Sequence, residues 1–148
     1  MNIRKAKQDE LDNLVQIWYD ASIASHDFIA ESFWDNNLKP MREVYLPMTE
    51  NIVIEFEKEI VGFCALNGNI IEALFIKPQK QSLGFGKRLI HFVKEVNDSI
   101  TLRVYKKNRC AILFYEKNGF ARVAESIDGA TQEVEIEMKW EKARRSEL

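Results

Sequence analysis

The feature that most constrains the fold is a strand, a glycine-containing turn and a helix in direct succession. Residues 70–76 read Ile-Ile-Glu-Ala-Leu-Phe-Ile, and a run that is apolar at every position but one is typical of a central strand covered on both faces. Pro78 ends this strand, and Gly84 and Gly86 precede a helix with apolar residues on one stripe over residues 85–96. The segment therefore predicts a sheet with helices packed against it.

The remaining sequence predicts further strands and helices on both sides of this segment. Alternating or β-branched runs predict strands at residues 3–6, 52–56, 60–66, 100–105, 121–125 and 134–140. Helical spacing predicts a helix after the first strand and a second helical stretch over residues 33–45, which Pro40 should end or kink. Asn108 is placed to cap a helix that runs through Tyr115, with Gly119 as its left-handed stop. This order predicts a mixed α/β sheet with helices on its faces.

Length and composition favour a single domain over residues 1–148. Hydrophobic residues make up 46% and charged residues 30% of the chain, which is enough apolar material for one core. The net charge of −2 argues against nucleic acid and anionic membrane surfaces as partners. Short, interrupted apolar runs and an N-terminus without an apolar signal core predict a soluble cytoplasmic protein. The charged residues 141–148 predict a frayed tail.

Cysteine and histidine are too sparse to predict a metal site. Cys64 and Cys110 stand far apart and neither belongs to a Cys-x-x-Cys pair, which argues against zinc and a redox motif and fits a reducing compartment. Both are flanked by apolar residues, so we expect buried structural thiols. His26 and His91 are too few and too separated to bind a metal unaided, and we expect His91 to be exposed.

The loop at residues 81–87 is a candidate anion site. Glycine lets the backbone approach a ligand closely, and the N-terminus of the following helix directs N–H groups and partial positive charge at the loop. These properties favour a phosphate or a pyrophosphate. The loop lacks both the Gly-Lys-Ser/Thr of the phosphate loop and the three spaced glycines of the dinucleotide fingerprint. A strand-to-helix turn that binds nothing is the alternative interpretation.

A second motif gives the glycine loop its context. The chain reads Gln-x-x-Gly-x-Gly from residue 81, Asn-x-x-Ala-x-x-Phe-Tyr from residue 108 and Gly-Phe at residue 119. Together these motifs resemble the GNAT superfamily of acyl-CoA-dependent N-acetyltransferases, and the resemblance spans essentially the whole chain. The stretches around Trp18, residues 25–28 and residues 73–76 are most similar to the small bacterial YiaC and YjaB branch. Ser82 departs from the pattern, because many members have glycine there.

The resemblance implies a fold and a donor. The fold would be a GNAT fold. It would have a mixed, mostly antiparallel sheet of about seven strands, helices on both faces and a splayed strand pair that holds CoA. The co-substrate would be acetyl-CoA, with no metal. The strand backbone at Leu74, Phe75 and Ile76 would pair with the pantetheine arm. The residues that would cradle the pyrophosphate are Gln81, Ser82, Leu83, Gly84, Phe85, Gly86 and Lys87.

The resemblance also assigns the helix that follows Asn108. Asn108 itself would contact the pantetheine arm, and the face that bears Ala111, Phe114 and Tyr115 would line the thioester end. Positive charge near the phosphates would come from Lys80, Lys87, Arg88, Lys107, Arg109 and Lys117. The alternative for any one of these cations is a solvated surface position.

Acetyl transfer to an amine needs a proton acceptor, stabilisation of an oxyanion and a proton for the departing thiolate. Tyr115 suits the last role, because the reference pKa of a phenol, about 10, lies close to that of a thiol. The resemblance places the general acid of the family at this position. A tyrosine packed in a helix for structural reasons is the alternative. A backbone N–H near Leu74 would polarise the thioester carbonyl.

The general base is less well determined by the sequence. Glu72 is the first candidate, because it interrupts an apolar strand beside the thioester position, where partial burial would raise its pKa. An edge-facing or ion-paired carboxylate is the alternative, and Glu55 on the neighbouring strand is the second candidate. His26 is a candidate base or substrate contact, with Phe28 and Trp34 as candidate walls of the acceptor groove. A surface or capping histidine is the alternative for His26.

These expectations combine into an N-acetyltransferase that passes the acetyl group from acetyl-CoA directly to a primary amine. The resemblance to the YiaC and YjaB branch implies a protein lysine or a protein N-terminus as the acceptor. A small-molecule amine, such as a polyamine, an amino acid or an antibiotic, is the main alternative. A non-catalytic acyl-CoA-binding module and an unrelated nucleotide-binding domain are alternatives from other classes. The C-terminal hairpin offers an edge to a second copy, so monomer and homodimer both stay open.

Overall fold

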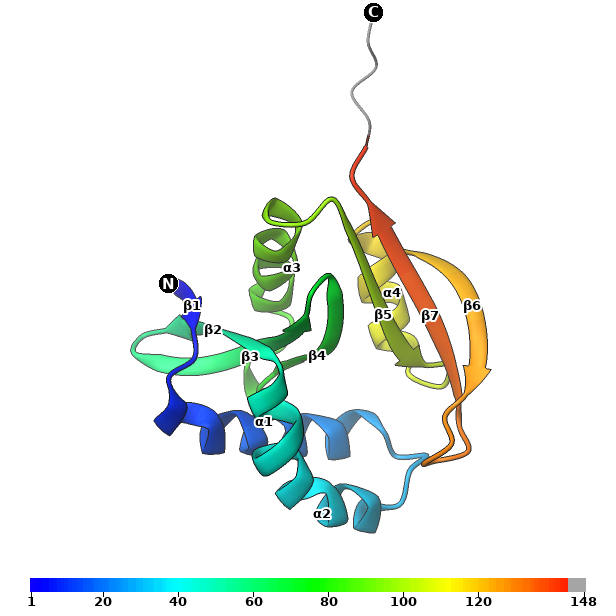
Figure 1. The fold of residues 1–148 in the computed structure, drawn as a ribbon, viewed down its shortest axis with the longest axis horizontal. Helices are drawn as coiled ribbons and strands as arrows, with labels where there is room; N and C mark the ends of the chain where they lie inside the picture. The colour runs from blue at the N-terminus through cyan, green and yellow to red at the C-terminus, as the bar shows by residue number, and fades with distance from the viewer. Residues whose placement is uncertain (144–148) are drawn as a thin grey trace, which may run out of the picture.

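The computed structural model describes residues 1–143, which form one seven-stranded sheet with helices on both faces (Figure 1). Every neighbouring pair of strands is antiparallel except β4 and β5, which confirms the mixed, mostly antiparallel sheet. Across the sheet the strands lie in the order β1-β2-β3-β4-β5-β7-β6. In chain order they are β1 (Asn2–Lys5), β2 (Glu50–Phe56), β3 (Glu59–Asn67), β4 (Ile70–Ile76), β5 (Ser99–Tyr105), β6 (Ala121–Ile127) and β7 (Val134–Glu141).

The helices of the described residues begin and end close to the predicted signals. Pro40 ends α2, and the chain continues as a π-helical turn over Met41–Tyr45 and a 3-10 turn over Leu46–Met48. Asn108 caps α4, because its Oδ1 accepts a hydrogen bond from the Ala111 N–H at 3.2 Å. Gly119 follows α4 in the left-handed region, with φ of +90°. The α-helices are α1 (Leu11–Ser25), α2 (Glu31–Pro40), α3 (Phe85–Glu95) and α4 (Arg109–Lys117).

The core has two apolar layers, one on each face of the sheet. Alternation along β2 sends Ile52 and Ile54 to the layer beneath α3 and α4, and Val53 to the layer beneath α1 and α2. Leu89 of α3 and Leu14 of α1 are both fully buried, one in each layer. The middle strands are therefore held on both faces, which gives the loops at the strand ends a rigid support.

β4 contains a β-bulge at Glu72, and the bulge was not predicted. Ala65 of β3 lies opposite Ala73, and the next residue, Leu66, lies opposite Ile71, so Glu72 has no partner in the register. β4 pairs with β5 only at its first two residues, before the bulge. Beyond it the strands separate, and the sheet splays into one half made of β1 to β4 and another made of β5, β7 and β6 (Figure 1). The expected splayed pair is confirmed.

Two expectations about burial are wrong. Residues 70–76 are not covered along their whole length, since Ile70 at the start of the strand and Glu72 at the bulge are exposed. Cys110 is exposed, because α4 turns Ile112 inward and leaves Cys110 on the outer side. Cys64 is buried on β3 as predicted, and its burial raises the pKa of the thiol to about 12.

The C-terminal end differs slightly from its prediction. β7 continues to Glu141, so the expected tail over residues 141–148 begins later, and residues 144–148 lie outside the described residues. In residues 1–143, no helix combines the length and the apolar character that crossing a bilayer requires. The same residues hold no group of three or more His, Cys, Asp or Glu side chains suited to a metal ion.

Candidate functional site

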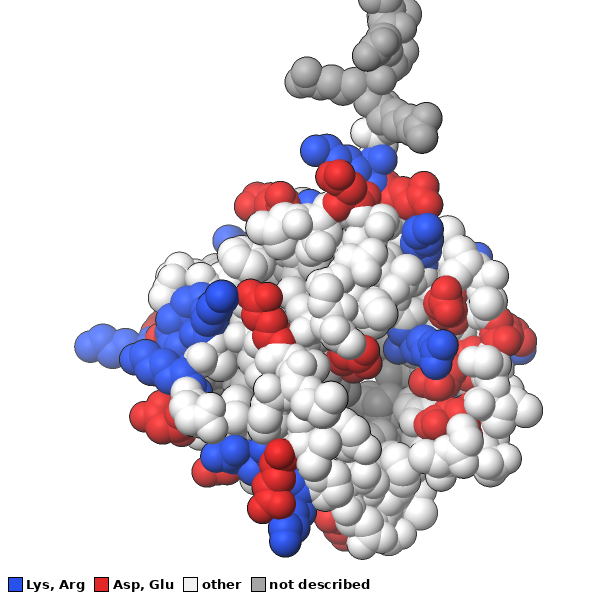
Figure 2. All heavy atoms as spheres, viewed as in Figure 1, with Lys and Arg blue, Asp and Glu red and all other residues white. Residues whose placement is uncertain are grey.

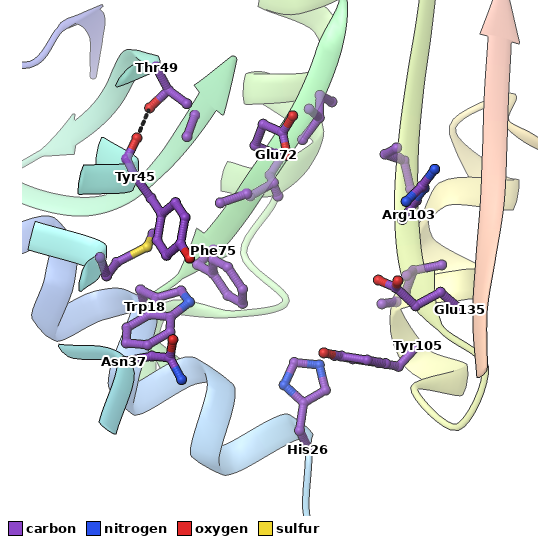
Figure 3. Close-up of a pocket in the computed structure, with 18 of the residues that line it drawn as sticks. Trp18, His26, Asn37, Tyr45, Thr49, Glu72, Phe75, Arg103, Tyr105 and Glu135 are labelled. Carbon is purple, nitrogen blue, oxygen red and sulfur yellow. Dashed lines mark hydrogen bonds between the residues drawn. The ribbon is translucent and has the colours of Figure 1, made fainter. Parts of the chain in front are cut away.

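A cavity of about 570 Å³ lies where β4 and β5 separate. Its walls come from both halves of the sheet, from α1, α2 and α4, and from the turns that follow α2. Figure 3 shows Glu72 on one side and Arg103 and Glu135 on the other, while His26 and Tyr105 point toward one another. On the same face, Figure 2 shows a hollow with acidic side chains on both sides of it. The cavity thus brings together polar groups from distant parts of the sequence.

The loop after β4 presents backbone N–H groups at the start of α3. Gly84 has φ of +89°, a left-handed conformation that glycine adopts without strain. The Arg88 N–H donates to the Gly84 carbonyl at 3.2 Å, which is the first hydrogen bond of α3. The N–H groups of residues 85–87 precede that bond, and Lys87 and Arg88 are exposed beside them. This end of α3 therefore suits an anion, as predicted for the loop.

The loop is held closely against α4 and β4. A Cβ at Gly86 would lie 3.1 Å from the Phe114 ring, so the two helices approach this closely because Gly86 has no side chain. Gln81 Nε2 donates to the Ile76 carbonyl at 3.2 Å and ties the loop to the end of β4. The Phe85 ring is buried in the core, so Phe85 offers the loop only its backbone.

Tyr115 carries a buried phenol that lines the cavity from α4. Its side chain packs edge-on against Phe114 and Phe120, with ring centroids 5.2 and 5.6 Å away. Burial, with a smaller contribution from Cys64, raises the pKa of Tyr115 above its usual value. A raised phenol pKa keeps the proton on Tyr115 at neutral pH. The group is therefore able to donate a proton to a leaving group in the cavity.

The sequence places this arrangement in a known family. Residues 47–122, which contain the loop, α3, Asn108 and Tyr115, match the acetyltransferase (GNAT) domain model. The chain belongs to the GNAT acetyltransferase family. It is therefore an acyltransferase, and the resemblance stated from its motifs is confirmed.

Relatives agree with this membership along the whole chain. The acetyltransferase is 31% identical over 139 residues to the peptidyl-lysine N-acetyltransferase YiaC of Escherichia coli K12, which covers 93% of this chain and 95% of YiaC. The solution structure of apo YjaB from Escherichia coli matches it with a TM-score of 0.85 at 28% identity, over 96% of this chain and 98% of YjaB. The expected similarity to the YiaC and YjaB branch is confirmed.

A more distant structure shares the fold. The PaiA N-acetyltransferase of Thermoplasma acidophilum, solved in complex with coenzyme A, has a TM-score of 0.80 at 19% identity and covers 95% of this chain and 98% of its own. Membership of the GNAT acetyltransferase family supports acetyl-CoA as the acetyl donor, and the PaiA structure adds the shared fold.

The structure brings many of the predicted site residues to the cavity. Those that line it are His26, Trp34, Glu72, Leu74, Phe75, Asn108, Ala111 and Tyr115. Phe28 is not among the lining residues, and instead packs against the rings of His26 and Tyr105, at 5.5 and 5.8 Å between centroids. Lys117 is exposed on the last turn of α4 and does not line the cavity either. The roles of all these residues remain predictions.

Three expectations about the candidate bases need correction. Glu55 does not line the cavity: it pairs with Arg4 of β1 and faces a separate groove, so it is excluded as a base there. Glu72 does line the cavity, but the expected partial burial is wrong, because the bulge leaves its side chain exposed (Figure 3). The alternative reading of His26 as a surface residue is also wrong, since its side chain is buried.

Three polar residues on the β5 side of the cavity were missed from the sequence. Arg103 and Tyr105 project from β5, and Glu135 of β7 lies opposite Tyr105 in the register. The Tyr105 hydroxyl donates to Asp128 Oδ2 at 2.7 Å. Burial and the nearby Asp128 carboxylate raise the pKa of Glu135, whereas Arg103 opposes the shift. The signal that could have found Arg103 and Tyr105 is the alternation of β5, whose polar positions face the open side of the splay.

Proposed function

We propose that this chain transfers the acetyl group of acetyl-CoA directly to the ε-amine of a lysine in a protein. The observation that carries the proposal is the cavity itself, which the phenol of Tyr115 and the carboxylates of Glu72 and Glu135 all line. The similarity to YiaC, whose name gives peptidyl-lysine as its acceptor, supports the choice of amine. The same geometry supports direct transfer, because acid and base candidates share one space.

The proposed chemistry uses two proton transfers. A lysine arrives as an ammonium, with a reference pKa of about 10.4, and must lose a proton before its nitrogen can attack the thioester carbonyl. Glu135 is the better placed acceptor, because its raised pKa brings it closer to that of the amine, and Glu72 is the second. When the carbon–sulfur bond breaks, the Tyr115 hydroxyl gives its proton to the sulfur. The products are an amide and a thiol.

The donor would lie along the open edge of β4 and the loop that follows. Beyond the bulge, the backbone at Leu74, Phe75 and Ile76 has β3 on one side and the splay on the other, which leaves an edge for the pantetheine arm. The loop over residues 81–87 would hold the pyrophosphate at the start of α3. Asn108 would contact the same arm from α4.

The mouth of the cavity favours a protein acceptor over a small amine. Tyr45 and Met48 line it and are 54% and 76% exposed, and Val44 beside them is 48% exposed. Exposed apolar side chains of this kind mark contact surfaces for another molecule. They can contact the residues that flank a lysine, whereas a free polyamine has no apolar groups of comparable size. We therefore expect a lysine with apolar neighbours to be a better acceptor.

The acceptor class is tested with purified protein, acetyl-CoA and a panel of amines. The panel holds a lysine peptide with apolar flanking residues, the same peptide with acidic flanks, a peptide whose only amine is its N-terminus, and spermidine. We expect acetylation of lysine, with the apolar-flanked peptide the best, measured by mass spectrometry. If spermidine is acetylated and no lysine peptide is, the cavity serves a small amine and the proposed acceptor is wrong.

The two carboxylates are expected to act on the acceptor and not on the donor. Glu135→Gln keeps the shape and removes the charge, so kcat/KM for the lysine peptide should fall by about 10²-fold, the lower end for loss of general base catalysis. Glu72→Gln should raise KM for the peptide by about tenfold, as expected for loss of a charge partner. The KM for acetyl-CoA is the internal control. Equal losses for both substrates would indicate a structural defect and not a role at the acceptor.

A further inference from the structure

His26 forms a bridge between the two halves of the splayed sheet. It lies directly after α1, in the half made of β1 to β4, yet it contacts Tyr105 of β5 and Asn108 at the start of α4. The two halves pair as strands only at the first residues of β4. His26 therefore provides a second connection at the other side of the cavity, where no strand pairing joins the halves in the described residues.

The hydrogen bonds of Asn108 define the protonation state of the ring. Its Oδ1 already accepts a hydrogen bond from the Ala111 N–H. The group that faces His26 Nε2 at 3.2 Å is therefore the amide Nδ2H2 group, which donates a hydrogen bond to the ring. A nitrogen that accepts a hydrogen bond carries no proton. His26 is therefore neutral, with its proton on Nδ1.

Aromatic rings enclose His26 and hold this state. Trp34 stacks on it at 5.2 Å with an interplanar angle of 26°, and Phe28 and Tyr105 contact it edge-on. The side chain is 6% exposed, and Nδ1 is buried without a hydrogen-bond partner among the described residues. Burial lowers the pKa of His26, although the Ser22 backbone carbonyl opposes the shift without forming a well-aligned hydrogen bond.

We propose that His26 is a positioning residue, which fixes the amide of Asn108 and thereby the start of α4 in the orientation needed to bind the acetyl donor. The inference rests on the proposed function, in which Asn108 contacts the donor and α4 carries Tyr115. Without an acceptor at Nε2, the Asn108 amide is held in its orientation by the Ala111 N–H alone, and a reversal costs one hydrogen bond instead of two. Reversed, it would present an amine to the Ala111 N–H, and the cap of α4 would be lost.

Protonation of His26 would break the bridge. The charged ring carries a proton on Nε2, which would then face the Nδ2 amine of Asn108, another donor. The ionisable groups around the ring are the Tyr105 phenol, the Asp128 carboxylate that accepts from Tyr105, and Lys107, whose ammonium lies 5.7 Å from the Phe28 ring centroid. The Asp128 carboxylate already accepts a hydrogen bond from the Tyr105 hydroxyl, and Lys107 is positive, so neither offers His26 an acceptor.

The sign of the pH dependence follows from the lowered pKa. The unfolded chain binds a proton at His26 near pH 6.5 and the folded chain only at lower pH. Stability is therefore complete above about pH 6.5 and falls as the pH drops below this value toward the folded-state pKa. Donor affinity should fall only as the pH approaches the folded-state pKa, because it is the folded protein that must bind the proton which disrupts Asn108.

Two variants separate the positioning role from a role in packing. His26→Gln offers an amide oxygen to Asn108 but cannot titrate, and His26→Phe keeps an aromatic ring but offers no acceptor. Calorimetric titration with CoA at pH 7.5 should show about tenfold weaker binding for His26→Phe and near wild-type binding for His26→Gln, since an unpaired buried donor has this cost. As the pH is lowered from 7.5 through the folded-state pKa of His26, CoA binding by wild type should weaken, and binding by His26→Gln should not change through this site.

Asn108→Asp tests the hydrogen-bond polarity directly. A carboxylate still caps α4, but it accepts from a protonated His26, so it should raise the pKa of the ring. Thermal unfolding between pH 7.5 and 5.5 should then show that wild type becomes less stable as the pH is lowered. The variant should show a smaller decrease in stability, or an increase. This measurement needs no CoA. Failure of wild type to bind CoA would therefore overturn the proposed function and leave the inferred hydrogen bond between His26 and Asn108 intact.

If wild type binds CoA and His26→Phe binds equally well, the positioning role is wrong. A loss confined to the peptide KM would instead make His26 a substrate contact.

Discussion

Tyr115→Phe is expected to lower kcat by about 10²- to 10⁴-fold while the affinity for acetyl-CoA stays within about twofold of wild type. The substitution removes one hydroxyl oxygen and leaves a ring that is buried between Phe114 and Phe120. Because burial raises the pKa of Tyr115, its phenol is protonated at every pH of a practical assay, and what the variant loses is the proton for the departing sulfur. Turnover is measured by release of free thiol, and affinity by calorimetry.

The control is Tyr19→Phe. Tyr19 also carries a hydrogen-bonded phenol, but on the outer side of α1, where it donates to Asp35 and does not line the cavity. Its turnover should equal that of wild type. A non-catalytic acyl-CoA-binding module would show no turnover in any of the three proteins. Unchanged kcat in Tyr115→Phe would show that another group or a water molecule acts as the general acid.

Ser82→Asp is expected to weaken binding of acetyl-CoA by about 10- to 100-fold, because it places a like charge beside the pyrophosphate. Ser82 has φ of +65° and is exposed in the glycine loop. Asp and Asn are the residues that best tolerate this left-handed conformation after glycine, so neither should distort the loop. Ser82→Asn is therefore the matched control, with the same shape and no charge.

Salt provides a second check on the loop. Ionic screening shortens the range of the repulsion, so the difference between the Asp and Asn variants should shrink as the salt concentration rises from about 0.05 M to 1 M. Wild-type affinity in both variants at low salt would show that the pyrophosphate does not lie at this loop. Equal losses in both would indicate that the serine hydroxyl itself binds the donor.

Much of the fold was predictable because its signals are local. The apolar strand at residues 70–76, the cap at Asn108 and the stop at Gly119 each depend on neighbouring residues, and each has a recognisable residue type. The glycine loop was predictable for the same reason. The structure also explains why one position of the loop is glycine, since Gly86 of α3 lies against the Phe114 ring of α4.

The rest of the site depends on contacts between distant segments. The bulge at Glu72 is a property of the pairing between β3 and β4, so the sequence showed only a misplaced carboxylate. Glu135 reaches the cavity because β7 pairs with β5, and nothing near it in the chain signals this. His26 lies in a polar stretch that is typical of a surface loop, but Trp34, Phe28 and Tyr105 enclose it from other segments.

The opening of the sheet depends on the one extra residue that the bulge adds to β4, and not on which side chain that residue carries. Ile71 and Ala73 already face consecutive residues of β3, so one extra residue separates the present strand from a regular one. Substitutions at Glu72 alter charge inside an opening that persists. A single inserted codon is sufficient to encode the extra residue.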